Sequence, residues 1–318
     1  MGKRRLGKSN IEVAPLMLGG NVFGWNIDEK TSFQILDAFM DAGFNFIDTA
    51  DVYSAWKEGN VGGESESVIG AWMKSRGNRE RVIVATKVGM ELGPDRKGLS
   101  RAYILRAVED SLRRLQTDYI DLYQSHKDDD ETALAETLGV YDELVQSGKV
   151  RVIGASNYSG ERLAKSLEVS KSNGFVRYES LQPHYNMYER AGYESDLEPV
   201  VVANNIGVIP YFSLASGFLT GKYRSEADFG KSVRGARMAN YLNDRGYRIL
   251  AALDQVAAEY GVNPAQVALG WLMARPGITA PIASATNIDQ LHDLVSATRL
   301  NLGVDAIAIL NLASSYDA

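Results

Sequence analysis

Short apolar runs alternate along this chain with longer stretches in which apolar residues recur every three or four positions. The runs are typical of buried strands, and the longer stretches are typical of amphipathic helices. The strands are predicted at Leu16–Leu18, Phe44–Ile47, Val82–Thr86, Ile120–Tyr123, Val150–Gly154, Ser180–Gln182, Val208–Pro210 and Ala280–Ala283. The helices are predicted at Thr31–Asp41, Glu64–Ser75, Arg101–Arg114, Glu131–Gln146, Ser159–Ser170, Leu250–Tyr260 and Ala265–Met273.

Regular alternation of strand and helix favours parallel strands joined by right-handed crossovers. Eight such units predict an α/β fold of the (β/α)8 TIM-barrel type, rather than an open doubly wound sheet. We expect one barrel domain over residues 1–318, preceded by a short hairpin that pairs Arg4–Leu6 with Ile11–Val13. A long irregular loop, Ser216–Asn243, follows the seventh strand and is expected on the catalytic face of the barrel.

Composition argues against several classes of function. The formal net charge is -6 and the basic residues are scattered, so nucleic-acid binding is not expected. The chain has no Cys, which excludes thiolate metal sites and suits the cytoplasm, where we expect the protein as a monomer or small homo-oligomer. No apolar stretch approaches the roughly 18 residues of a membrane-spanning helix, so no membrane association is expected.

Several weak motifs carry no function. Gly19–Gly24 has the wrong glycine spacing for a Rossmann dinucleotide site, and Gly217–Lys222 is one residue too short for a phosphate-binding P-loop. His126, His184 and His292 lack the spacing of a metal site, so no metal is expected.

Polar residues that directly follow barrel strands face the active site. The second predicted strand leads to Asp48 and Tyr53, the third to Lys87 and the fourth to His126. Together these four residues suit protonation of a carbonyl oxygen while hydride is added to its carbon. Tyr53 would donate the proton, Lys87 would lower the Tyr53 pKa, Asp48 would hold Lys87, and His126 would orient the carbonyl.

The motifs around these residues resemble those of the aldo-keto reductases. Phe46–Tyr53 with Gly63–Glu66 resembles the FIDTAxxYG…GxSE signature, and Ala85–Lys87 resembles the lysine motif of the family. Asp121–His126 is similar to DLYQxH, and Gly148–Asn157 is similar to GKVRxIGxSN. The resemblance implies a (β/α)8 barrel that reduces aldehydes or ketones with NADPH, using Asp48, Tyr53, Lys87 and His126 as a catalytic tetrad.

The resemblance also implies where the cofactor binds. Ser156, Asn157 and Gln182 would bind the carboxamide, and Tyr211 would stack on the nicotinamide ring. Residues implied along the diphosphate are Phe212, Ser213, Leu214, Ala215, Gly217 and Lys222. Residues implied at the adenosine end are Ser284, Ala285, Thr286 and Gln290.

The segment Ile282–Leu294 departs from the family pattern because it contains no Arg or Lys to bind a 2′-phosphate. Lys222 and Arg224, in the long loop, are candidates to supply that charge. The sequence therefore leaves NADP and NAD as alternatives.

Substrate identity and reaction direction stay open. Trp25, Trp56 and Met90 are candidate substrate contacts, and aromatic side chains suit either a planar carbonyl compound or a sugar. The same tetrad would serve an NAD(P)-dependent sugar or alcohol dehydrogenase that works in the oxidative direction. A further alternative is a cofactor-sensing regulatory subunit, as found among potassium-channel β subunits of the same superfamily.

Overall fold

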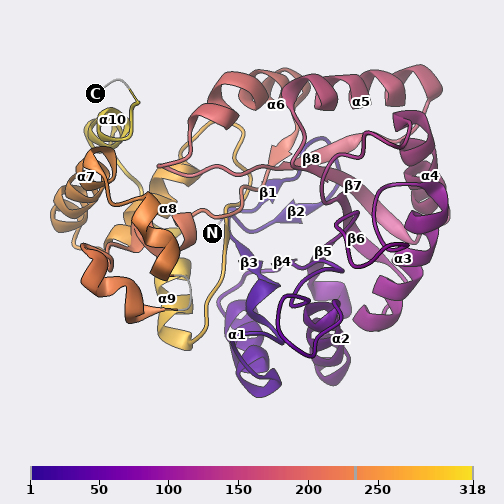
Figure 1. Cartoon of the computed structure of the whole chain (residues 1–318), viewed down its shortest axis with the longest axis horizontal. Coiled ribbons are helices and arrows are strands. Elements are labelled where there is room, and N and C mark those ends of the chain that lie inside the picture. The colour runs from indigo at the N-terminus through magenta and orange to yellow at the C-terminus, as the bar shows by residue number, and fades with distance from the viewer. Residues whose placement is uncertain (1, 233–234, 317–318) are drawn as a thin grey trace.

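Eight parallel strands form the centre of the structure, a computed structural model that describes residues 2–232 and 235–316 (Figure 1). They are β3 (Met17–Gly19), β4 (Phe46–Asp48), β5 (Ile83–Val88), β6 (Ile120–Ser125), β7 (Val150–Ser156), β8 (Tyr178–Gln182), β9 (Gly207–Val208) and β10 (Ile282–Ala283). From β3 to β9 each strand pairs with the next one in the chain, and β10 returns to pair with β3. This strand order is the one that the alternating sequence pattern predicts.

The sheet closes on itself between β9 and the segment that leads into β10. The Val208 N–H donates to the Gly277 carbonyl at 3.1 Å, and the Thr279 N–H donates to the Val208 carbonyl at 2.7 Å. Further along, the Ile282 N–H donates to the Pro210 carbonyl at 2.9 Å. The predicted barrel is therefore confirmed.

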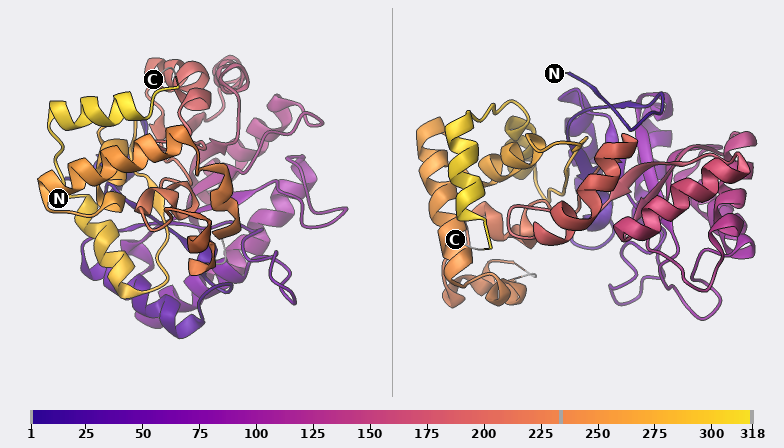
Figure 2. Two further views of the ribbon diagram at one scale, coloured as in Figure 1. Left: turned by 60° about the vertical axis from the view of Figure 1, so that its left-hand side comes forward. Right: turned by 90° about the horizontal axis from the view of Figure 1, so that it is seen from above.

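Helices cover the outside of the barrel (Figures 1 and 2). Those at predicted positions are α1 (Glu29–Asp41), α2 (Glu64–Arg76), α3 (Arg101–Leu115), α4 (Leu134–Gln146), α5 (Gly160–Asn173), α7 (Asp244–Tyr260) and α8 (Pro264–Met273). Several begin after a side chain that accepts a hydrogen bond from an N–H of the first turn, an N-cap worth about 1 kcal/mol. These caps include Asp28, Ser100, Ser159, Asn243 and Asn263.

Three helices were not predicted: α6 (Glu198–Asn204), α9 (Ile288–Ala297) and α10 (Val304–Ala313). The first has only 7 residues and follows a turn of π-helix, Tyr193–Leu197, which disrupts the helical period. The last is apolar on nearly every face, so it shows little of the polar and apolar alternation that marks a surface helix. In each of these two cases the periodic signal is too weak to reveal the helix.

The predicted N-terminal hairpin consists of β1 (Arg4–Arg5) and β2 (Glu12–Val13). Its apolar side chains pack inside the barrel in one cluster with inward-facing strand residues: Leu6, Ile11, Val13, Met17, Phe46, Ala85, Leu122, Ile209, Ala280 and Ile282. Arg4 attaches the hairpin to the segment before β10, because its Nη1 donates to the Ile278 carbonyl at 3.0 Å. The hairpin fills one end of the barrel and leaves the carboxyl ends of the strands to form a site.

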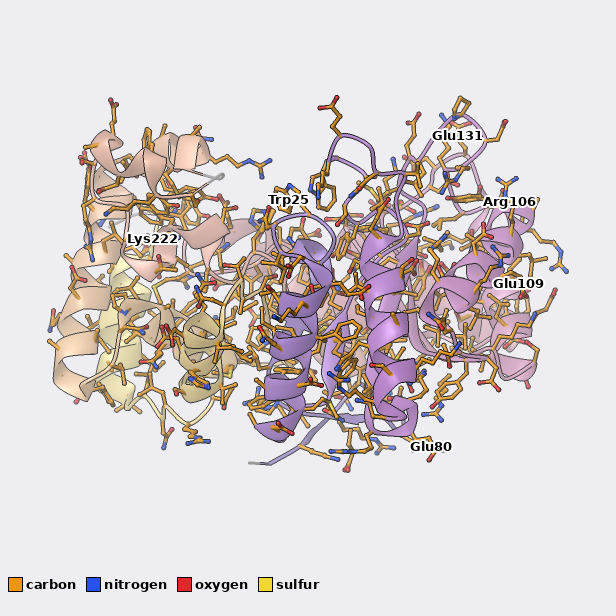
Figure 3. The ribbon with its side chains drawn as sticks, turned by 90° about the horizontal axis from the view of Figure 1, so that it is seen from below. Trp25, Glu80, Arg106, Glu109, Glu131 and Lys222 are labelled. Atoms are coloured by element: carbon orange, nitrogen blue, oxygen red, sulfur yellow. The ribbon has the colours of Figure 1, made fainter. Side chains whose placement is uncertain are left out.

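The loop after β9 contains three short 3₁₀ helices, Ala215–Thr220, Glu226–Lys231 and Gly235–Asn240, where we expected irregular structure. Figure 3 shows Glu80, which precedes β5, on the opposite side of the molecule from the loop that carries Trp25. Over residues 2–232 and 235–316, no helix is long and apolar enough to cross a membrane. The same residues contain no group of three or more His, Asp or Glu side chains that could hold a metal ion.

Candidate active site

Polar side chains gather where three neighbouring strands end. Asp48 is the last residue of β4, and Tyr53 lies in the loop that follows it. Lys87 lies in β5, and His126 directly follows β6. Because these strands are adjacent in the barrel, the four side chains predicted from the sequence come together. Lys87 is 0% exposed and Asp48 is 2% exposed, so this pair of charges is removed from water.

Hydrogen bonds join three of the four side chains. Lys87 Nζ donates to both carboxylate oxygens of Asp48, at 2.7 and 2.8 Å, and to Tyr53 Oη at 2.8 Å. It also donates to the Thr49 carbonyl at 2.8 Å. Tyr53 Oη in turn donates to Asp48 Oδ2 at 2.8 Å. The buried ammonium group therefore has the counterion and the acceptors that a charge in an apolar interior requires.

Burial and the neighbouring Asp48 carboxylate raise the pKa of Tyr53 well above its ordinary value. Burial lowers the pKa of Lys87, and Asp48 opposes that shift. The expectation that Lys87 lowers the Tyr53 pKa is not met, because Asp48 lies as close to the phenol oxygen as the ammonium group does. Tyr53 consequently keeps its proton and is a hydrogen-bond donor.

His126 faces the same space, with its ring centroid 6.0 Å from that of Tyr53. Its Nδ1 atom is buried and has no hydrogen-bond partner among the described residues. Burial and the nearby Lys87 charge lower the pKa of His126 well below its ordinary value. The imidazole is therefore neutral and carries one N–H that can donate to a bound group.

Two amide side chains, those of Gln182 and Asn157, hydrogen-bond to residues of the site. Gln182 Nε2 donates to Asp48 Oδ1 at 2.9 Å. Asn157 Nδ2 donates to the His126 carbonyl at 2.8 Å, and Tyr211 Oη donates to Asn157 Oδ1 at 2.7 Å. These bonds fix the orientation of the Tyr211 ring beside the buried charges.

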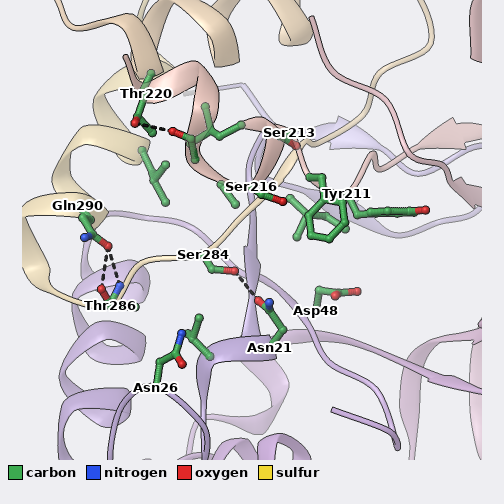
Figure 4. A pocket seen from close by; sticks show the side chains of 18 of the residues that line it. Asn21, Asn26, Asp48, Tyr211, Ser213, Ser216, Thr220, Ser284, Thr286 and Gln290 are labelled. Carbon is green, nitrogen blue, oxygen red and sulfur yellow. Dashed lines mark hydrogen bonds between the residues drawn. The ribbon is translucent and has the colours of Figure 1, made fainter. Parts of the chain in front are cut away.

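A cavity of about 780 Å³ opens in front of these side chains, and Asp48, Tyr53, His126 and Trp56 form part of its lining. The predicted cofactor-binding residues that line it are Ser156, Asn157, Gln182, Tyr211, Phe212, Ser213, Leu214, Gly217, Lys222, Ser284, Thr286 and Gln290. Figure 4 shows two pairs in this lining: Ser284 Oγ donates to Asn21 at 2.6 Å, and the Thr286 N–H donates to Gln290 at 2.9 Å. The volume is that of pockets that hold small molecules and cofactors.

Four predicted contacts do not line the cavity within the described part of the chain. Ala215 and Ala285 are fully buried. Trp25 packs edge-to-face on Trp56, with ring centroids 5.4 Å apart, and Met90 lies outside the lining. Sequence reasoning missed other lining residues: Asn21, Val22, Asn26, Ser216, Thr220, Lys231, Ser232, Asn263, Ala265, Ile282, Ala283, Asp293 and Leu294. For Ser216, Thr220, Lys231 and Ser232, one indication was present in the sequence, which was that the long loop containing them was expected on the catalytic face.

The long loop brings two lysines to the cavity. A Cβ placed on Gly217 would lie 3.9 Å from Lys222 Nζ, so the ammonium group lies against glycine backbone. Lys231 Nζ donates to the Lys222 carbonyl at 2.8 Å and forms an ion pair with Asp228 Oδ1 at 2.7 Å. The guanidinium of Arg224, in contrast, donates to Asp254 at 2.7 and 2.8 Å and is not part of the lining described here. Lys231 and Arg224 are thus each paired with a carboxylate, so Lys222 is the better candidate to bind an anionic group, and Arg224 is not supported.

Backbone strain marks the segment that follows β9. Phe212, Ala215 and Ser216 have φ values of 52°, 47° and 57°, in the left-handed region. For residues other than Gly this conformation is unfavourable by roughly 1–2 kcal/mol each. Strain of this kind is often found where a backbone is shaped to hold a ligand. The segment lines the cavity beside Tyr211, which agrees with a binding role.

Comparison with known proteins places the site in context. Residues 15–313 match the family model described as Aldo/keto reductase family. Uncharacterized oxidoreductase YrpG of Bacillus subtilis (strain 168) is 37% identical, over 96% of this chain and 94% of that protein. Aldo-keto reductase YhdN of the same strain is 35% identical, over 91% and 85%. A probable voltage-gated potassium channel subunit beta of Oryza sativa subsp. japonica is 33% identical, over 93% and 91%.

Proposed function

Because the chain belongs to the aldo/keto reductase family, we propose that it reduces aldehydes or ketones to alcohols with NADPH, and that Tyr53 donates the proton. The family match and the relatives named as oxidoreductases support an oxidoreductase enzyme. The observation that carries the finer proposal is the Tyr53 hydroxyl, which lines the cavity and lies 2.8 Å from both Asp48 and Lys87.

The cavity residues suit the nicotinamide cofactors that the family generally uses. Tyr211 supplies a flat ring, held in orientation by Asn157, beside the buried charges. Lys222 and Lys231 supply cations of the kind that bind phosphate groups. Gln290 and Thr286 supply polar atoms further along the lining. When bound, the cofactor supplies the hydride, and Tyr211 would pack against its nicotinamide ring while the lysines bind its phosphates.

Tyr53 would protonate the substrate oxygen by turning its O–H from Asp48 toward the cavity. The phenolate that forms would lie 2.8 Å from Lys87 Nζ. At that separation the attraction between unit charges is about 6 kcal/mol for an effective dielectric constant of about 20, and repulsion from the equally close Asp48 carboxylate opposes it. Asp48 holds the ammonium group in place, and the neutral His126 can donate its N–H to the substrate carbonyl.

Protonation of Tyr53 supports the reductive direction. The group present at neutral pH is a phenol, which is a proton donor, because burial and Asp48 keep the pKa high. Oxidation of a sugar or alcohol uses the same residues but needs the phenolate as a base. The same four residues would serve reduction and oxidation. Steady-state rates measured in each direction distinguish a reductase from a dehydrogenase.

NADPH is the cofactor that the charges favour over NADH. Lys222 and Lys231 both line the cavity, and Lys231 is paired with Asp228, whereas the segment after β10 supplies no positive charge. Arg and Lys are the usual partners of an added phosphate monoester. Asp293 also lines the cavity and opposes the binding of a phosphate close to it. The lysines of the long loop are therefore proposed to decide the preference.

The proposal is tested with Tyr53→Phe, and with Tyr247→Phe as a control that removes a half-exposed phenol outside the cavity lining. NADPH and NADH are titrated by quenching of Trp and Tyr fluorescence, and reduction of a nitrobenzaldehyde is followed at saturating NADPH. We expect turnover to fall roughly 10²–10⁴-fold in Tyr53→Phe with NADPH binding retained. Full activity without the Tyr53 hydroxyl would refute the mechanism. Binding of NADPH without turnover of any carbonyl compound or alcohol would favour a cofactor-sensing regulatory subunit, the role suggested by the name of the rice relative.

A further inference from the structure

A buried carboxyl group close to the site has no hydrogen-bond partner. Asp51 lies between Asp48 and Tyr53 in the chain and is 2% exposed. Neither of its carboxylate oxygens has a partner among the described residues. Buried polar groups are nearly always hydrogen-bonded, and a buried charge without a partner is strongly unfavourable. The proton transfer proposed above gives Asp51 no role, so its place in the site calls for another explanation.

The backbone connects Asp51 to the catalytic lysine. The Asp51 N–H donates to the carbonyl of Lys87 at 3.2 Å, which ties the loop between Asp48 and Tyr53 to β5. The loop is also packed closely, because a Cβ on Gly62 would lie 2.8 Å from the Asp51 carbonyl oxygen. A charge on Asp51 acts on Lys87 directly and favours its ammonium form. The charge state of Asp51 therefore acts on Lys87, one of the two partners of the Tyr53 phenol.

Arg114, the basic residue of α3 that acts on Asp51, already forms an ion pair with another carboxylate. Arg114 Nε donates to Glu66 at 2.6 Å, and Thr86 Oγ1 donates to the same carboxylate at 2.5 Å. Glu66 is 0% exposed, so its negative charge is felt strongly. The titratable and charged groups around Asp51 are Glu66 on α2, Tyr103 and Arg114 on α3, Arg96 before α3, Lys87 on β5, Tyr123 on β6 and Tyr141 on α4.

These surroundings place the titration of Asp51 near neutral pH. Burial and the Glu66 carboxylate raise the pKa of Asp51 to about 8, while Arg114 and Arg96 oppose the shift. The geometry and the charges thus agree: in the part of the chain that the structure describes, neither carboxylate oxygen has a hydrogen-bond partner of good geometry, and the charged form is disfavoured although the Val52 N–H partly favours it. The group is mostly protonated at pH 7.

We propose that Asp51 is a positioning residue, whose uncharged carboxyl leaves Lys87 with Asp48 as its nearest counterion. Ionisation of Asp51 adds a further negative charge near Lys87, beside those of Asp48 and Glu66. That charge disfavours the Tyr53 phenolate, which must form during reduction, and so slows proton donation. This inference rests on the proposed function of Tyr53 as the proton donor.

The first test is the pH profile of kcat for NADPH-dependent reduction, measured from pH 6 to pH 10. In wild type we expect kcat to fall above pH 8, the titration range of Asp51. In Asp51→Asn we expect that decrease in kcat to be absent or to begin roughly one pH unit higher. A shift of this size is expected when a charge several Å from the reacting groups is removed. The control Glu58→Gln removes an exposed carboxylate from the same segment and keeps the wild-type profile. A variant Asp51→Asn that is merely less stable, with an unchanged pH profile, would overturn the inference.

The second test needs no turnover and separates this inference from the proposed function. Infrared spectra record the C=O stretch of a protonated carboxylic acid, which we expect in wild type at pH 6 and not in Asp51→Asn. By linkage, Lys87→Met raises the pH at which this band disappears, because the positive charge that favours the carboxylate is lost. If the wild-type protein shows no reductase activity but Lys87→Met still shifts this band, the proposed function is rejected and the coupling between Asp51 and Lys87 is kept. A band that is missing in wild type, or unmoved by Lys87→Met, would reject the coupling itself.

Discussion

Replacing Asp51 with Asn is expected to change how the stability of the protein depends on pH. In the folded protein the pKa of Asp51 is about 8, against an ordinary value of 3.8. The folded state therefore binds this proton more tightly than the unfolded chain does. The stability that this group contributes is fully present below pH 4, falls as the pH rises between the two values, and is lost above pH 8.

The size of the effect follows from the two pKa values. Between them, each pH unit removes about 1.4 kcal/mol from the free energy of unfolding. From pH 5 to pH 7 the loss from Asp51 alone is therefore about 3 kcal/mol. Residue 51 does not titrate in Asp51→Asn, so the free energy of unfolding of this variant changes less between pH 5 and pH 7 than that of wild type, by that amount. The unpaired amide adds a destabilisation that is the same at every pH.

Urea denaturation followed by Trp fluorescence at pH 5, 6, 7 and 8 measures this difference. The quantity to compare is the slope of the unfolding free energy against pH in wild type, Asp51→Asn and Glu58→Gln. The last variant has lost an exposed carboxylate and should follow wild type. Parallel slopes for wild type and Asp51→Asn would mean that Asp51 is ionised in the folded protein and would refute the reasoning.

Other residues give equally direct tests. Lys87→Met should lower turnover roughly 10²–10⁴-fold while NADPH still quenches the fluorescence; a smaller loss would mean that the phenolate does not need the ammonium group. Lys222→Gln should weaken NADPH binding about tenfold, or about 1.4 kcal/mol, and change NADH binding little, whereas Lys231→Gln removes a lysine already paired with Asp228 and should have the smaller effect; equal weakening of NADPH and NADH binding in Lys222→Gln would contradict the assignment. Gly70→Ala should destabilise the protein by about 1–3 kcal/mol in urea, because an added Cβ would lie 2.2 Å from the Arg114 carbonyl oxygen; an unchanged midpoint would show that α2 and α3 can separate freely.

The barrel and the four polar residues at its three strand ends could be predicted from sequence for the same reason. A parallel barrel buries its strands completely, so each strand appears as a continuous apolar run with polar residues at its carboxyl end. Asp48, Lys87 and His126 stand at such ends, and Tyr53 follows within the next loop. Their positions depend on the order of strands, which a sequence pattern records well.

Loop conformation could not be predicted in the same way. Lys231 reaches the cavity because its ammonium group binds the Lys222 carbonyl, and no periodic pattern encodes that contact. Burial of Asp51 is a second case, since Asp residues in loops are usually exposed or hydrogen-bonded to nearby backbone. Trp25 supports Trp56 from outside the described cavity lining, although both were expected to contact substrate. Each of these outcomes depends on packing between segments that are distant in sequence.

Pairing of β3 with β10 has a consequence for synthesis of the protein. Leu18 pairs with Ala283, and Ser284 bonds to Asn21 across 263 positions of the chain. At a translation rate of about 5–20 residues per second, β3 waits on the ribosome for roughly 15–50 s before its partner strand is made. During that time one of its edges is open to pairing with other chains. The nascent chain, rather than the finished enzyme, is therefore the form most exposed to aggregation, and slow codons near the end of the message would prolong that exposure.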